Sequence, residues 1–149
     1  MKKILIGVVI VIILIQFIPV NHDNPVSNPG NEIVVETDVK QILQNSCYDC
    51  HSNKTEWPLY SYVAPVSWLV SNHVQKGRRH LNFSEWGTYD PKRQSKKIKE
   101  IWDEVSEGEM PLTSYLMAHP KAKLSPNDIS LLKEWAVIKG DSSMEKEEE

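Results

Sequence analysis

The sequence predicts an all-α domain over residues 37–140, preceded by an N-terminal transmembrane helix. Apolar residues recur at a spacing of three or four in three segments of the domain, which is the period of a half-buried helix. Two of these segments open with a Pro, a residue that suits the first turn of a helix. No segment alternates apolar and polar residues as a half-buried strand does. The recurring apolar residues are Val39, Ile42 and Leu43, then Ile98, Ile101 and Val105, then Ile129, Leu132 and Ala136.

The N-terminus pairs two basic residues with an apolar run. Lys2 and Lys3 precede residues 4–18, which are almost entirely apolar. The run ends without the small residues of a signal-peptide cleavage site and without a Cys for lipid attachment. As a helix, Ile4–Val20 would extend roughly 25 Å. Residues 1–20 are therefore predicted to form an uncleaved, single-pass anchor in the cell membrane, with the rest of the chain on the extracytoplasmic, periplasmic side.

Composition divides the rest of the chain into three parts. Residues 21–36 are rich in Asn, Pro, Ser and Gly and predict a flexible tether. Residues 37–140 hold the domain, and the largely acidic residues 141–149 predict a disordered tail. The formal net charge is −3 and no basic stripe is interleaved with aromatics, so nucleic acid is not expected as a partner.

Start and stop residues set the expected helices. A short helix capped by Thr37 or Asp38 should lead directly to Cys47. Residues 53–66 should be loop with at most short turns, because they contain two X-Pro steps. Further helices are expected from Pro65 to about Gln75 before Gly77, from Pro91 to Gly108, and from Pro126 to Gly140. Ser125 and Asp128 form a capping box for the last of these.

The two cysteines of the chain stand in a C-x-x-C-H motif, as Cys47, Cys50 and His51. On a helical turn, positions i, i+3 and i+4 share one face, so the three side chains point the same way. Two thiols so placed can form thioethers with the vinyl groups of a haem while the imidazole ligates its iron. The motif predicts one covalently attached haem c, and the porphyrin would also add apolar surface to the core of a small domain.

The motif has three rival interpretations: a disulfide, a redox dithiol and a zinc site. A disulfide between cysteines three apart adds little stability and leaves His51 without a role. A thioredoxin-like dithiol needs a βαβ setting, which the sequence does not predict. A zinc site would need a second Cys or His pair at suitable spacing, and the chain has none. Haem attachment is therefore the favoured interpretation.

Met110 is the preferred second axial ligand. It stands in the run Gly108-Glu109-Met110-Pro111, just after a predicted helix, where Pro111 stiffens the loop. Met117, beside an aromatic and a Leu, is better interpreted as a packing residue. The other candidates are His73, His80 and His119. The metal ligands are therefore predicted to be His51 and Met110, and a Met ligand raises the reduction potential relative to a second His.

Several short motifs together resemble the bacterial haem-binding domain family of small c-type cytochromes, over about residues 40–138. The resemblance implies a cytochrome-c-like helical fold, thioether links at Cys47 and Cys50, and iron ligation by His51 with Met110 opposite. It implies a cofactor more than a physiological partner. The motifs are the run 47–52, Trp57-Pro58, Tyr60-Ser61, the run 64–68, Gly77-Arg78, the run 81–84, Trp86, the run 108–111, and His119-Pro120.

Two further groups of residues have candidate roles around such a cofactor. Arg78 and Arg79 could pair with haem propionates, or could form a solvated basic loop. The tryptophans are expected mainly to fill the core around a large flat ligand. They are Trp57, Trp68, Trp86, Trp102 and Trp135.

The function expected from these residues is one-electron transfer at the outer face of the membrane, by a carrier rather than an enzyme. With His51 and Met110 both on the iron, no position stays open for a substrate. The expected partners are redox proteins of the membrane or periplasm, with the N-terminal anchor in the membrane itself. The alternatives are a haem peroxidase with an open iron, using His73, His80 or His119 as acid/base, and a haem-based sensor.

Overall fold

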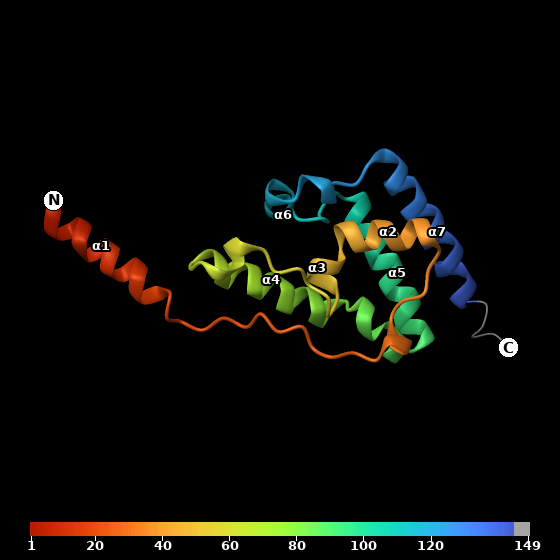
Figure 1. Ribbon diagram of the computed structural model, residues 1–149. Helices are drawn as coiled ribbons and strands as arrows, with labels where there is room; N and C mark the ends of the chain where they lie inside the picture. The colour runs from red at the N-terminus through yellow and green to blue at the C-terminus, as the bar shows by residue number, and fades with distance from the viewer. Residues whose placement is uncertain (145–149) are drawn as a thin grey trace.

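The computed structural model describes residues 1–144, with side chains for residues 1–140. Its described residues form helices and turns without a strand, so the all-α prediction is confirmed (Figure 1). The α-helices are α1 (Lys2–Ile15), α2 (Thr37–Ser46), α3 (Tyr48–His51), α4 (Val66–His80), α5 (Pro91–Ser106), α6 (Thr113–Ala118) and α7 (Pro126–Met144). The 3-10 helices are η1 (Pro29–Asn31), η2 (Leu59–Tyr62), η3 (Phe83–Thr88) and η4 (Pro120–Ala122).

Apolar burial organises the domain around a core between α2, η3, α5 and α7. Helices α5 and α7 pack along each other, and α2 lies against α7 (Figure 1). Leu43, Phe83 and Leu132 are almost fully buried at the centre. Burying a side chain of this size contributes on the order of 1.5–3 kcal/mol. The short helix α3 follows α2 directly and packs on α4, which places the C-x-x-C-H motif at the edge of this core.

Side-chain caps start two of the long helices, and the cap of the second was predicted. Asp90 precedes Pro91 and accepts a hydrogen bond from the amide of Arg93 at 2.8 Å. At α7, the Ser125 amide donates to Asp128 at 2.8 Å and the Asp128 amide donates to the Ser125 hydroxyl at 3.2 Å. These bonds satisfy amides that have no partner within the helix, so both helices begin where the sequence predicted.

Helix α4 differs from its predicted end. It continues through Gly77 to His80, because that glycine meets a neighbouring turn instead of ending the helix. The helices η3 and α6 were not predicted at all. They are six residues long each, and α6 buries none of its residues, so neither carries the apolar period that reveals a helix in a sequence.

The predicted N-terminal membrane anchor is wrong. Helix α1 ends at Ile15, so its 14 residues rise about 21 Å, well short of the roughly 30 Å of a bilayer core. Among the described residues, no helix combines the length and apolar character needed to cross a membrane. Beyond α1, the side-chain amide of Gln16 bonds to the backbone of Ala64. Its Oε1 accepts the Ala64 amide at 2.9 Å, and its Nε2 donates to the Ala64 carbonyl at 3.2 Å. The expected single-pass location in the cell membrane, with the domain on the periplasmic side, depended on this anchor and is therefore also wrong.

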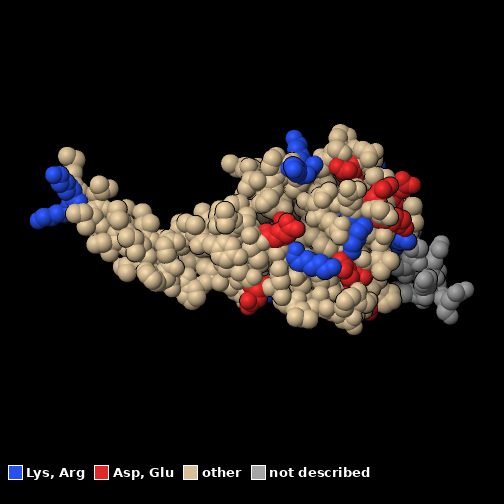
Figure 2. Space-filling model, viewed as in Figure 1, with Lys and Arg blue, Asp and Glu red and all other residues tan. Residues whose placement is uncertain are grey.

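Residues 21–36, expected to be a flexible tether, run along the domain and contact it. Figure 2 shows α1 projecting from the domain, with basic side chains at its tip and almost no other charge along it. The His22 ring hydrogen-bonds to the Ser61 carbonyl at 2.7 Å, and Ile33 is buried in the core. At the other end of the chain, α7 runs to Met144, and residues 145–149 of the expected acidic tail lie outside the described residues.

A charged cluster fastens residues 21–36 to α2. The Glu32 carboxylate accepts hydrogen bonds from Lys40 at 2.8 Å, from the Tyr48 hydroxyl at 3.0 Å and from Lys54. Partial burial acts to raise the pKa of Glu32, but these three donors outweigh it and lower the pKa to about 2. Since the unfolded chain has the ordinary pKa near 4.5, the cluster stabilises the fold fully above pH 4.5 and is lost as the pH falls towards 2.

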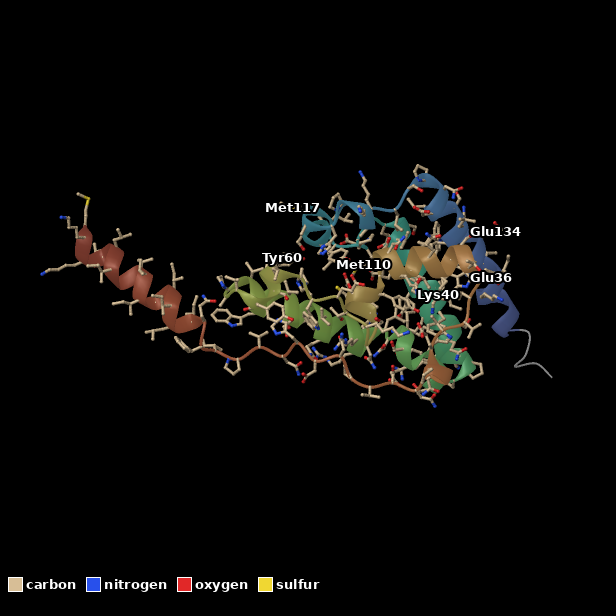
Figure 3. All side chains as sticks on the ribbon, in the orientation of Figure 1. Glu36, Lys40, Tyr60, Met110, Met117 and Glu134 are labelled. Atoms are coloured by element: carbon tan, nitrogen blue, oxygen red, sulfur yellow. The ribbon has the colours of Figure 1, made fainter. Side chains whose placement is uncertain are left out.

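We expect Glu32→Gln to lower the free energy of unfolding at pH 7 by about 2 kcal/mol, because the charged acceptor for three donors is removed. The difference from wild type should shrink as the pH falls below 4.5. Urea unfolding at a series of pH values measures both effects. The control is Glu134→Gln on the exposed face of α7 (Figure 3), which should leave stability nearly unchanged. An equal loss at pH 7 and pH 3 would contradict the role of Glu32.

Candidate functional site

The C-x-x-C-H motif forms a closed turn at the junction of α2 and α3. Cys47 lies between the two helices, and its carbonyl accepts the amides of Cys50 at 3.2 Å and His51 at 2.9 Å. These bonds bring the side chains of all three residues to the wall of one hollow region. The structure thus brings the three predicted motif residues together on one side of the turn.

His51 is held in the orientation of a metal ligand. Its Nδ1 lies 3.2 Å from each of two carbonyl oxygens, those of Gly77 and Leu81. A nitrogen that faces carbonyls must carry the ring proton, so Nε2 keeps a free lone pair. Burial lowers the pKa of His51 even though the two carbonyl contacts raise it. The imidazole is therefore neutral, which is the form that binds metals.

Gly77 allows α4 to approach the motif this closely. A Cβ at this position would overlap the carbonyl oxygen of Cys50 and would lie 3.0 Å from its carbonyl carbon. Any larger residue would push α4 away from the turn, and the carbonyls of Gly77 and Leu81 would move with it. The glycine was predicted to stop the helix, but its role is this close contact.

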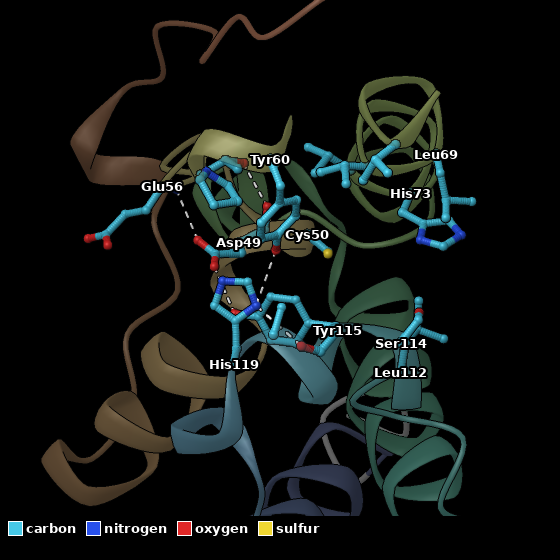
Figure 4. Close-up of a pocket in the computed structure, with 16 residues that line it drawn as sticks. Asp49, Cys50, Glu56, Tyr60, Leu69, His73, Leu112, Ser114, Tyr115 and His119 are labelled. Atoms are coloured by element: carbon cyan, nitrogen blue, oxygen red, sulfur yellow. Dashed lines mark hydrogen bonds between the residues drawn. The ribbon is translucent and has the colours of Figure 1, made fainter. Parts of the chain in front are cut away.

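Three adjoining cavities open in front of the motif. The first, of about 230 Å³, lies between α4 and α6, and in Figure 4 the Cys50 sulfur points into the space framed by Tyr60, His73 and Tyr115. The second, about 100 Å³, lies between the motif and α5, and the third, about 340 Å³, connects the two. Residues lining more than one of them include Cys47, Cys50, His51, His73, Met110 and Tyr115. Together they form a hollow with an extended, largely apolar wall.

Both thiols are free and protonated. Neither Cys47 nor Cys50 forms a disulfide. Burial raises the pKa of Cys47 to about 12 and that of Cys50 to about 11. A structural zinc site needs four ligands, so two cysteines would require further His, Cys or carboxylate ligands beside them. In the described part of the chain no three His, Cys, Asp or Glu side chains gather as ligands of an ion.

Met110, the preferred candidate for the second axial ligand, lies at the hollow in front of the motif. It lines two of the cavities together with Cys47 and His51. Met117 is 84 % exposed and lies at the outer edge of the domain (Figure 3). His73 and His80 each line cavities as well, but the exposed His80 ring lies 3.4 Å from Glu100.

A polar network at the cavity wall was not predicted. The Tyr115 hydroxyl donates to Asp49 at 2.7 Å, and the Tyr115 ring stacks on His119 with centroids 4.2 Å apart. The Tyr60 hydroxyl lies 3.4 Å from the same His119 ring. Asp49 stands between the two motif cysteines, and the Tyr60-Ser61 and His119-Pro120 motifs were further signals in the sequence, but none of them indicated the contact with Tyr115. Burial and the nearby Asp49 carboxylate both raise the pKa of Tyr115, which stays protonated.

The basic pair and the tryptophans lie away from the cavities. Arg78 donates to the carbonyls of Ser52 at 2.8 Å and Asp23 at 2.7 Å, so it fastens the N-terminal segment to the motif loop. Neither it nor Arg79 lines the three cavities, and neither does any tryptophan. Trp86 and Trp135 are buried in the core, so the core-filling role expected of the tryptophans is confirmed for these two.

Comparison with known proteins identifies one family. The family model described as haem-binding domain matches residues 10–137, most of the chain. The chain has no significant match among curated proteins or among solved structures.

The residues present fit a haem on their own geometry. A neutral imidazole with a free Nε2 faces a hollow with largely apolar walls, and two free thiols stand beside it. The close contact at Gly77 fixes the position of that imidazole.

We expect Gly77→Ala to lower the free energy of unfolding by about 2 kcal/mol, because the added methyl group overlaps the Cys50 carbonyl. Chemical denaturation of the purified protein measures the change. The matched control is Gly140→Ala in α7, where a Cβ would meet no atom within 4 Å. There, alanine should be neutral or stabilise the helix by up to about 1 kcal/mol. Equal effects of the two substitutions would contradict the close contact at Gly77.

Proposed function

This chain belongs to the haem-binding domain family, and from that premise we propose that it carries one haem c and transfers single electrons. Cys47 and Cys50 would attach the haem, and His51 and Met110 would ligate the iron from its two sides. The proposed partners are redox proteins that donate or accept one electron.

The single observation that carries the proposal is the orientation of His51. Its Nδ1 is committed to two backbone carbonyls, and its Nε2 makes no hydrogen bond within the described part of the chain. A neutral, half-buried histidine with one free nitrogen beside a hollow is prepared to ligate a metal before the metal arrives. Cys47 and Met110 line the same hollow, so the residues needed for attachment and for a second ligand are close by.

The thiols suit covalent attachment. In thioether formation the sulfur adds to one vinyl carbon and its hydrogen ends on the other, so no oxidant is required. This reaction needs reduced, unpaired cysteines, and both Cys47 and Cys50 are free. The spacing places their side chains on one face of the turn with the imidazole.

The protein around the site favours a carrier over an enzyme. When bound, the haem iron supplies the one-electron couple. Met110 lines the hollow with His51, and with these two residues on the iron no position would be left for a substrate. The largely apolar walls would lower the polarity around the haem, and a Met ligand would raise the reduction potential relative to a second His.

We expect the wild-type chain, expressed with cytochrome c maturation machinery, to gain the mass of one haem that survives denaturation. Cys47→Ala and Cys50→Ala should each leave one thioether, and the double variant should lose its haem on acid–acetone extraction, because no carbon–sulfur bond remains. Mass spectrometry and extraction measure the attachment. Ser52→Ala, next to the motif, is the control and should keep covalent haem. A wild-type protein with the bare polypeptide mass would contradict the proposal.

We expect Met110→Ala to lose the sulfur-to-iron absorbance band at the red edge of the ferric spectrum and to bind cyanide readily, because the sixth position opens. The reduction potential should fall. Absorbance spectra and a redox titration measure these changes, with Met117→Ala as the exposed control. An unchanged spectrum in Met110→Ala would direct the search to His73 and His80. A wild-type iron that binds peroxide at once would favour the peroxidase alternative.

A further inference from the structure

The segment that carries Met110 is weakly held in the domain. It leaves α5 through Gly108, whose φ of +76° turns the chain, and continues into α6, none of whose residues is buried. On the α5 side, the amides of Glu109 and Met110 both donate to the Glu104 carbonyl, at 3.0 and 3.2 Å. Segments with few buried contacts open most easily, so this loop needs a second attachment to stay in place.

That second attachment is a hydrogen bond to the motif turn. The Tyr115 hydroxyl donates to Asp49 Oδ2 at 2.7 Å. Among the described residues, one other hydrogen bond joins 109–119 to the part of the chain before α5. It is the longer contact, 3.4 Å, between the Tyr60 hydroxyl and the His119 ring. Bonds to a carboxylate are stronger than bonds between neutral groups, so Tyr115 makes the main connection.

Both ends of this bond are themselves fixed. Asp49 lies inside the C-x-x-C-H turn, and its Oδ1 accepts the Glu56 amide at 3.0 Å. Tyr115 lies five residues after Met110, and its amide donates to the Leu112 carbonyl at 2.9 Å, which closes the first turn of α6. A short, hydrogen-bonded stretch of chain therefore connects the bond to Met110.

We propose that Tyr115 is a positioning residue, whose hydrogen bond to Asp49 holds the Met110 loop against the Cys47–His51 turn and so keeps the Met110 sulfur on the haem iron. This inference rests on the proposed function. The bond links the turn that carries the first axial ligand directly to the loop that carries the second. When it breaks, the loop opens on its α5 hinge and the sixth position of the iron becomes accessible.

Tyr115→Phe removes only the hydroxyl and keeps the ring on His119. We expect cyanide to bind the ferric holoprotein of this variant about tenfold more tightly than it binds wild type. Losing a hydrogen bond to a carboxylate should raise the equilibrium constant for loop opening by about that factor. Amide exchange at Leu116 and His119 should accelerate by a similar factor, while exchange in α7 stays the same. Absorbance titration and hydrogen exchange with mass spectrometry measure the two effects.

Tyr60→Phe is the matched control, since it removes a hydroxyl from the same cavity wall. Its cyanide affinity should stay within about twofold of wild type. Asp49→Asn weakens the acceptor and should give an intermediate gain that disappears in the Tyr115→Phe background, because both substitutions break one bond. Wild-type affinity in Tyr115→Phe, equal effects of Tyr60→Phe and Tyr115→Phe, or additive effects of Asp49→Asn would overturn the inference.

The wild-type protein separates this inference from the proposed function. Absence of covalent haem or of the red-edge band in wild type refutes the proposed function before any Tyr115 variant is made. A wild type with both features and an unresponsive Tyr115→Phe refutes only the positioning role.

Discussion

The close contact between α4 and the motif turn is the constraint on which the site depends. Gly77 brings the α4 backbone to the Cys50 carbonyl, and this approach places the carbonyls of Gly77 and Leu81 beside His51. A backbone is a rigid partner, so it fixes both the proton and the orientation of the imidazole. The geometry of the His51 imidazole is thus set by main-chain packing.

The hollow around the motif has two unlike sides. The side towards α5 is built on the main core, where Phe83 and Ile101 are buried. The side towards α6 is held by the polar contacts of Tyr115 and His119, with no buried residue in α6 itself. Stability is therefore unequal around the site: the His51 side is rigid, and the Met110 side rests on a few hydrogen bonds.

Apolar period and capping predicted much of the fold. Helices α5 and α7 begin where the sequence signals placed them, because a helix that buries one face and caps its own amides reveals both features locally. Helix α2 begins close to its expected start, but the predicted cap is wrong: Thr37 lies inside the helix, and Glu36 precedes it without a side-chain capping bond. The same reasoning failed where a local feature has a non-local purpose. In the sequence, Gly77 looks like a helix end, but in the fold it allows close contact with Cys50. Tyr115 has no distinguishing signal in the sequence, and its hydrogen bond to Asp49 appears only in the fold.

The N-terminus shows that the length of an apolar run in the sequence does not give the length of the helix it forms. The run of residues 4–18 is apolar almost throughout, but α1 stops at Ile15 and Gln16 bonds to Ala64 instead of continuing the helix. Likewise, the polar composition of residues 21–36 predicted a free tether, whereas Glu32 and Ile33 contact the domain. The composition of a segment shows how much apolar surface it contains, but it does not show which contacts the rest of the chain makes with it.

The C-x-x-C-H spacing, the all-α class and the candidate ligands follow from residue type and helical period, which are local properties of the sequence. Which of these residues meet depends on how the helices pack. The tertiary structure shows that His51 faces two carbonyls of α4, that Met110 shares its cavity while Met117 is exposed, and that Arg78 serves the N-terminal segment. These facts depend on contacts between residues distant in the chain, which packing sets and sequence spacing does not record.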